Sequence, residues 1–155
     1  MITEIRFMSQ ADAVKLVPMQ DTALISITEP GELADLAQGW DHLHRISFHD
    51  CDESTFSGCI LFDSSMADRL IDFVDCLPHD VNRIFIHCHA GISRSAAVAK
   101  FISERLDVNF NNQYPLYNKL VYRTLRTNGF EKNFLIGMTE PESSTENTSL
   151  KPSNR

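Results

Sequence analysis

The chain has 155 residues, of which 43% are apolar and 23% charged, and this composition suits one globular domain with a real hydrophobic core. The formal net charge is −7 and no block of Lys or Arg occurs, which argues against nucleic-acid and anionic-membrane partners. No apolar run reaches membrane-spanning length and the first residues do not form an export signal, so we expect a cytoplasmic protein.

The predicted elements alternate between strands and helices. In chain order they are a strand at 23–27, a strand at 44–48, a helix at about 66–77, a strand at 81–87, a helix at 93–106 and a helix at about 117–127 that ends at Asn128-Gly129. Such alternation predicts a single α/β domain over residues 1–138, with a central, mostly parallel sheet flanked by helices. Residues 139–155 contain one large apolar residue, Leu150, and are expected to form a disordered tail.

The helix at 66–77 has recognisable end signals. Ser64 or Ser65 is expected to be its N-cap, and Pro78 marks its end. Asp63 is expected to cap or precede this helix rather than to act in catalysis.

Residues 87–95, with the sequence HCHAGISRS, connect the predicted strand at 81–87 to the predicted helix at 93–106. In parallel α/β domains, ligands bind outside the carboxyl ends of the strands. Loop amides and a helix N-terminus that converge on one point form an anion site, and Gly91 permits a positive φ there. We therefore expect a phosphate-type or sulfate-type anion to be bound by the loop positions His89, Ala90, Gly91, Ile92 and Ser93, together with Arg94.

Four side chains of this segment suit phosphoryl transfer. Cys88, at the base of the cradle, is expected to have a lowered pKa and to attack phosphorus as a thiolate, which forms a phosphocysteine. Arg94 offers a planar fork for two phosphate oxygens. Ser95 can donate a hydrogen bond to the Cys88 sulfur, and His87 can orient the loop from beneath. The alternative is a plain buried cysteine in an ordinary connection, but the joint spacing of Cys, Gly, Arg and Ser favours the phosphate loop.

This pattern, His-Cys followed by five residues and then Arg-Ser, resembles the signature of the protein-tyrosine phosphatase superfamily, and most of all its dual-specificity branch and compact bacterial members. The resemblance is specific over the loop and extends over most of residues 20–130. It implies a Cys nucleophile, an Arg clamp and an Asp general acid, without metal or cofactor.

A general acid must protonate the leaving oxygen, and four carboxyl groups follow predicted strands: Asp50, Asp52, Glu53 and Asp63. Members of the superfamily carry the acid on a comparable loop before the cysteine. We prefer Asp50, because Phe48-His49-Asp50 ends its strand as the superfamily pattern does, and Asp52 is the second choice. Both residues would lie beside Cys88 if the strand at 44–48 neighbours the strand that leads to Cys88. Alternatively, both residues are solvated loop acids.

The substrate class follows from the loop composition. Its variable positions contain no Lys and the chain is acidic, which favours a phosphorylated protein or peptide, with phosphotyrosine first, over inositol lipids and RNA 5′-triphosphates. One alternative is a catalytically weak phosphoprotein-binding module on the same fold. Another is a redox or metal sensor built on the four cysteines and six histidines.

Three further hypotheses concern residues outside the loop. Zinc at His42, His44, His49 and Cys51 is disfavoured because a second ligand pair with finger spacing is missing. Cys51 could form a protective disulfide with Cys88, although a free thiol is the simpler interpretation. Asn118 could brace the loop or line the rim of the pocket.

Overall fold

The computed structural model describes residues 1–52 and 57–138. The predicted tail at 139–155 and the candidate acid Glu53 lie outside the described residues. In chain order the elements are β1 (Glu4–Ser9), α1 (Gln10–Ala13), β2 (Thr22–Thr28), β3 (His42–Ser47), α2 (Ser64–Asp75), β4 (Arg83–Cys88), α3 (Arg94–Leu106) and α4 (Lys119–Met138). The four strands form one parallel sheet in the order β1-β4-β2-β3, which confirms the predicted α/β class.

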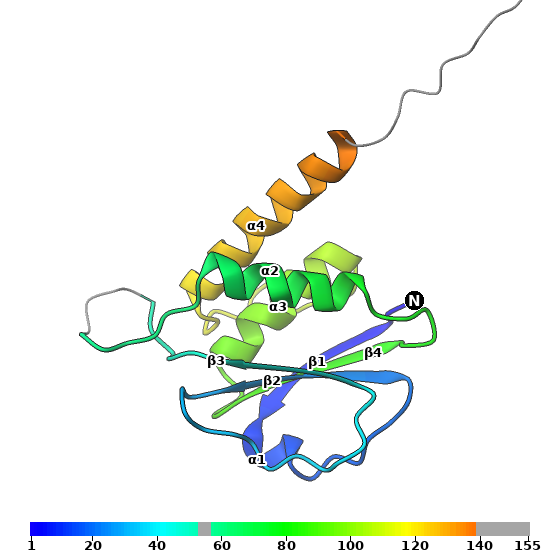
Figure 1. The fold of residues 1–155 in the computed structure, drawn as a ribbon, viewed down its shortest axis with the longest axis vertical. Helices are drawn as coiled ribbons and strands as arrows, with labels where there is room; N and C mark the ends of the chain where they lie inside the picture. Colours follow the sequence, from blue (N-terminus) through cyan, green and yellow to red (C-terminus); the bar gives the residue numbers. More distant parts are fainter. Residues whose placement is uncertain (53–56, 139–155) are drawn as a thin grey trace, which may run out of the picture.

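The sheet separates two layers of unequal size. Figure 1 shows α2, α3 and α4 on one face, and α1 with the connections on either side of β2 on the other. The main core lies under the three helices, where Ile25 and Ile86 are fully buried. A smaller cluster on the opposite face contains Leu24 and Phe85. Neighbouring residues of one strand thus face opposite layers, as the two-residue period of a strand requires.

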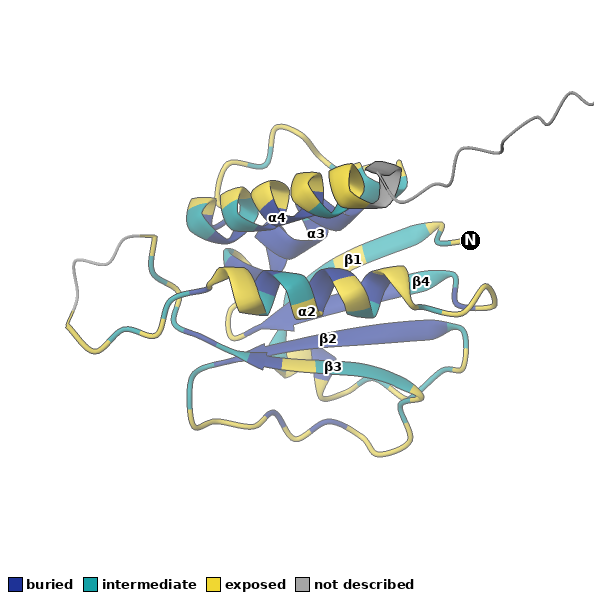
Figure 2. Cartoon of the chain, turned by 45° about the horizontal axis from the view of Figure 1, so that its top comes forward, coloured by how far each residue is buried: buried dark blue, intermediate teal, exposed yellow. Residues whose placement is uncertain are grey.

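Burial follows the order of the strands. β2 is buried along its whole length, whereas β3 at the edge is mostly half-buried (Figure 2). β4 is the other inner strand and is buried from Ile84 to Cys88. The two strands with the highest content of β-branched and aromatic residues therefore occupy the centre of the sheet.

Several local features differ from what the sequence suggested. The acid segment was placed beside Cys88 on the condition that the strand at 44–48 neighbours the strand that leads to Cys88, and this condition is not met, because β2 lies between β3 and β4. The N-cap of α2 is Asp63, whose side chain accepts from the Met66 amide, rather than Ser64 or Ser65; the expectation that Asp63 caps or precedes this helix is confirmed. In addition, β1 and α1 were not predicted.

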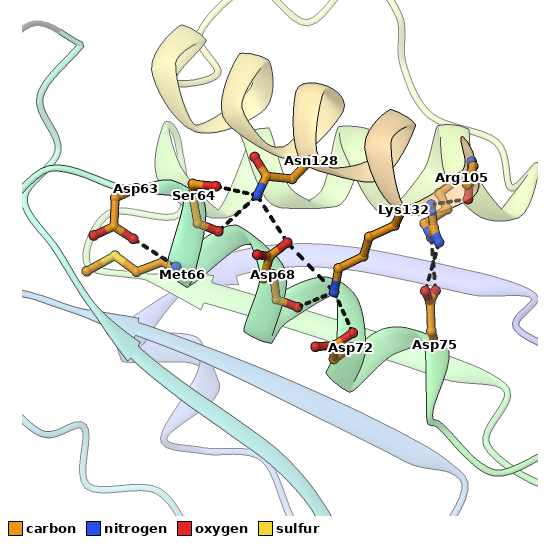
Figure 3. A network of polar contacts seen from close by, with 10 residues as sticks. Asp63, Ser64, Met66, Asp68, Asp72, Asp75, Arg105, Asn128 and Lys132 are labelled. Atoms are coloured by element: carbon orange, nitrogen blue, oxygen red, sulfur yellow. Dashed lines mark hydrogen bonds and ion pairs between the residues drawn. The ribbon is translucent and has the colours of Figure 1, made fainter. Parts of the chain in front are cut away.

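The last helix does not end at Asn128-Gly129 but continues to Met138. The amide of Asn128 points toward α2 and donates to the Ser64 carbonyl at 3.0 Å, the Ser64 hydroxyl at 2.7 Å and Asp68 Oδ1 at 3.1 Å (Figure 3). Gly129 is buried, and a Cβ there would lie 3.0 Å from the Phe101 ring. These two residues end many helices, but here they serve the packing of α4 on α2 and α3.

Replacing Asn128 with Ala is expected to lower the free energy of unfolding by about 1–3 kcal/mol. The change removes the amide donor and leaves the α2 groups that accept from it without this hydrogen bond. Urea unfolding monitored by circular dichroism measures this loss. Asn133→Ala on the same helix is the control, since Asn133 makes one exposed contact of 3.4 Å with Arg105. Equal stability of the two variants would contradict a structural role for Asn128.

Candidate active site

The loop from Cys88, the last residue of β4, to Arg94, the first residue of α3, lies at the carboxyl edge of the sheet. β4 is flanked by β1 and β2, so the loop has a strand end on each side. The backbone amides of Gly91, Ile92 and Ser95 act on the Cys88 sulfur and lower its pKa. The loop and the first turn of α3 therefore converge on one atom, which is the geometry of an anion cradle.

Gly91 is required by the backbone that surrounds it. Its φ is 68°, in the region that side chains rarely adopt. A Cβ at this position would lie 2.3 Å from the Ser9 nitrogen and 2.4 Å from the Met8 carbonyl carbon. The Gln10 amide also donates to the His89 carbonyl at 3.2 Å. The end of β1 thus supports the loop from one side, a contact that the sequence pattern did not reveal.

Cys88 is 2% exposed and its Sγ lies 3.1 Å from the Ser95 hydroxyl. Burial alone would raise the pKa of this thiol. The hydrogen bonds from the Ser95 hydroxyl and from the amides of Ser95, Gly91 and Ile92 outweigh burial and hold the pKa of Cys88 below its usual value. A thiolate is thus favoured at the base of the cradle.

Ser95→Ala should shift the reactivity of Cys88 toward higher pH. Because the pKa of Cys88 is lowered, the wild type keeps its thiolate at a lower pH than an ordinary cysteine does. Removal of the hydroxyl donor raises the pKa of Cys88, so the variant becomes protonated at a higher pH than the wild type. We expect about a tenfold slower alkylation by iodoacetamide at pH 6, followed by peptide mapping of Cys88. Ser103→Ala, which removes another buried hydroxyl of α3, is the control. An unchanged pH profile for Ser95→Ala would contradict the assigned hydrogen bond.

Arg94 is 3% exposed, yet its guanidinium is only partly satisfied. Nη1 donates to the Phe48 carbonyl at 2.7 Å, and Nη2 pairs with Glu29 Oε1 at 2.8 Å. Nε is buried and has no partner among the described residues. An unpaired donor on a buried cation is costly, so this nitrogen is suited to an anionic ligand.

Glu29 is a residue of this site that sequence reasoning missed. It follows β2 directly and therefore lies at the same edge of the sheet as Arg94. An acidic residue one position beyond an inner strand was the signal that could have identified it.

His87 lies beneath the loop, fully buried, with Nε2 at 2.7 Å from the Ser26 hydroxyl on β2. Burial lowers the pKa of His87, which favours the neutral imidazole. A neutral, buried ring that is hydrogen-bonded to a neighbouring strand can fix the orientation of the loop that follows it.

The two candidate acids occupy different places. Asp50 Oδ1 accepts from the Ser93 hydroxyl and from the Asn118 amide, both at 2.8 Å. Asp52 Oδ1 instead accepts from the Lys119 amide at 3.2 Å, at the start of α4. Asp50 therefore contacts the cradle, whereas Asp52 caps a helix.

Asn118 joins the acid segment to the last helix. Its amide nitrogen contacts Asp50 Oδ1 and, at 3.4 Å, the Cys51 carbonyl. Its Oδ1 accepts from the Val121 amide at 3.0 Å, as an N-cap of α4 would. Its backbone amide donates to the Ser93 carbonyl at 3.1 Å, so Asn118 also braces the loop.

The residues weighed for zinc do not come together. His44 stacks on Phe73, and His49 Nδ1 accepts from the Ile60 amide at 2.8 Å. Across residues 1–52 and 57–138, no group of three or more His, Cys, Asp or Glu side chains has an arrangement that could hold a metal ion.

Comparison with known proteins gives a short match. No family model matches the chain. A stretch of 35 residues is 49% identical to dual specificity protein phosphatase 1-A of Xenopus laevis, which covers 23% of this chain and 10% of that protein. The similarity points to the phosphatase class at a coarse level. In the described part of the chain, no helix combines the length and apolar character needed to cross a membrane.

Proposed function

We propose that this chain is a cysteine-dependent phosphomonoester hydrolase, of the protein-tyrosine or dual-specificity type, that acts through a phosphocysteine intermediate. The observation that carries the proposal is that two buried groups belong to the same cradle. One is the Cys88 sulfur, whose pKa is lowered by loop amides and the Ser95 hydroxyl. The other is Nε of Arg94, which has no partner in the part of the chain that the structure describes. A nucleophile and an anion clamp together are what phosphoryl transfer needs.

In the first step, the Cys88 thiolate attacks phosphorus in line and the bond from phosphorus to the leaving oxygen breaks. Loop amides and Arg94 hold the equatorial oxygens while their charge changes. Asp50 gives its proton to the leaving oxygen. Ser93 and Asn118 both bind Oδ1 of Asp50, and no residue in the described ranges bonds to Oδ2, which leaves Oδ2 for that transfer.

In the second step, Asp50 accepts a proton from water, and the water oxygen attacks phosphorus as the bond from phosphorus to sulfur breaks. The Ser95 hydroxyl, 3.1 Å from Sγ, stabilises the departing thiolate. Inorganic phosphate then leaves the cradle and the free enzyme is restored.

The phosphotyrosine preference rests on what surrounds the loop. Arg94 is paired with Glu29, and Asp50 and Asp52 lie on the facing segment. Such an acidic rim disfavours polyanionic lipids and RNA, and suits a single phosphate group on a protein side chain.

The direct test is the intermediate itself. The wild-type chain is mixed with para-nitrophenyl phosphate in the presence of a metal chelator, quenched in acid within milliseconds and digested for mass spectrometry. We expect a peptide that carries one added phosphoryl group on Cys88, together with released nitrophenol. Release of nitrophenol without the adduct in Cys88 peptides would overturn the covalent mechanism. Failure of the chelated chain to hydrolyse the ester would favour a phosphoprotein-binding module.

A further inference from the structure

Two thiols lie side by side just beyond Asp50. The Sγ atoms of Cys51 and Cys59 are 2.9 Å apart, although the residues are eight positions apart in the sequence. Both cysteines are free and half-buried. A disulfide bond is about 2.05 Å long, so an approach of roughly one ångström would join the two sulfurs.

The backbone around the two thiols holds them together. The His49 amide donates to the Ile60 carbonyl at 2.8 Å, and the Ile60 amide donates back to His49 Nδ1 at 2.8 Å. The segments that carry Cys51 and Cys59 are thus bonded to each other next to the sulfurs. The short sulfur–sulfur distance is therefore supported by the fold.

The same pair is connected to the candidate acid. Asp50 lies between His49 and Cys51 in the chain, and Asn118 contacts both Asp50 Oδ1 and the Cys51 carbonyl. A constraint on Cys51 therefore also constrains the backbone that presents Asp50 to the cradle.

We propose that Cys51 and Cys59 form a redox modification site, at which a low-molecular-weight disulfide such as oxidised glutathione links the two sulfurs and fixes the segment that carries Asp50. The effect on turnover rests on the proposed function, whereas the disulfide itself does not. The site differs from a Cys51–Cys88 bond, because it leaves the nucleophile free.

The reaction balances as two thiol–disulfide exchanges. One thiol attacks oxidised glutathione and expels a glutathione thiolate, and the second thiol then attacks the mixed disulfide and expels the other. The two cysteines lose two electrons and two protons, which the two released glutathione thiols carry away.

The order of attack follows from the environment of Cys51. The hydrogen bond with Cys59, burial, and the nearby charges of Cys59, Asp50 and Glu29 raise the pKa of Cys51 to about 11. Cys51 therefore keeps its proton near neutral pH, and we expect the mixed disulfide to form first on Cys59. Cys51 then closes the bond.

Peptide mapping tests the modification site. The full chain is equilibrated with oxidised and reduced glutathione, free thiols are blocked with iodoacetamide, and the linked peptides are identified. We expect a Cys51–Cys59 linkage that reduced glutathione reverses, and none in Cys51→Ser or Cys59→Ser. A Cys51–Cys88 linkage in its place, or no linkage under oxidising ratios, would overturn the proposal.

An activity ratio tests the coupling to Asp50. Phenyl phosphate needs a general acid, whereas 2,4-dinitrophenyl phosphate has a good leaving group and does not. The ratio of the two rates in one sample does not depend on how much Cys88 remains unmodified. We expect oxidation to raise the phenyl to dinitrophenyl ratio by about two- to tenfold in the wild type and to leave it unchanged in Cys59→Ser.

Failure of the coupling to Asp50 and failure of the proposed function give different results. A confirmed Cys51–Cys59 linkage with an unchanged ratio would overturn the coupling to Asp50. A reduced chain that hydrolyses neither ester would overturn the proposed function and the coupling with it, and peptide mapping alone would then decide the modification site.

Discussion

Cys88→Ser is expected to lower the hydrolysis of para-nitrophenyl phosphate by at least about 10⁴-fold. The donors around Sγ lower the pKa of a thiol, but the same donors cannot ionise a serine hydroxyl near neutral pH. The loop amides and Arg94 remain in place, so the variant should still bind an oxyanion. The measurements are steady-state rates and a thermal shift with added tungstate.

Cys76→Ser is the matched control for this prediction, because Cys76 is an exposed free thiol at the end of α2. Its rate should equal that of the wild type. Hydrolysis by Cys88→Ser at the wild-type rate would show that the observed activity does not use the cradle. Loss of tungstate binding in the same variant would show instead that the sulfur is needed to form the anion site.

Asp50→Asn is expected to lower phenyl phosphate hydrolysis by about 10²–10⁴-fold, and to change the rate with 2,4-dinitrophenyl phosphate much less. The asparagine keeps an Oδ1 that accepts from Ser93 and Asn118, so the segment stays in place and only the proton is lost. Steady-state kinetics with both esters separate the loss of an acid from a general loss of activity.

Asp52→Asn provides the comparison, since the sequence left Asp52 as the second choice. Its carboxylate accepts from the Lys119 amide, so the variant should keep near-normal turnover and lose up to about 1 kcal/mol of stability. A larger kinetic loss in Asp52→Asn than in Asp50→Asn would reverse the assignment.

Much of the fold could be predicted because the inner strands are strongly patterned. The runs that became β2 and β4 are rich in β-branched residues, and their strands were located to within two residues. The order of the strands in the sheet was harder to predict from the sequence than their positions, because it depends on which strand edges pair and not on the local residue pattern. The sequence therefore left open whether β3 lies beside β4, and the structure pairs β3 with β2 instead.

In the candidate site, too, the local features could be predicted from the sequence and the long-range contacts could not. The roles proposed for Cys88, Arg94 and Ser95 depend on one contiguous segment, whose spacing carries its chemistry. Asp50 reaches the cradle although β3 and β4 are not neighbours, because the chain beyond β3 turns toward α3 and the Phe48 carbonyl accepts from Arg94. Contacts that join distant segments, such as Gly91 with the end of β1, have no signature in a single sequence.

The close approach of Gly91 to the end of β1 has a consequence for folding. The cradle is complete only when a strand from the start of the chain has paired with β4, as Ser9 does with Cys88. Contacts between residues so far apart in sequence form slowly and are lost together. The low pKa of Cys88 should therefore appear late in refolding, and the thiolate absorbance of this one residue can report when the native sheet has closed.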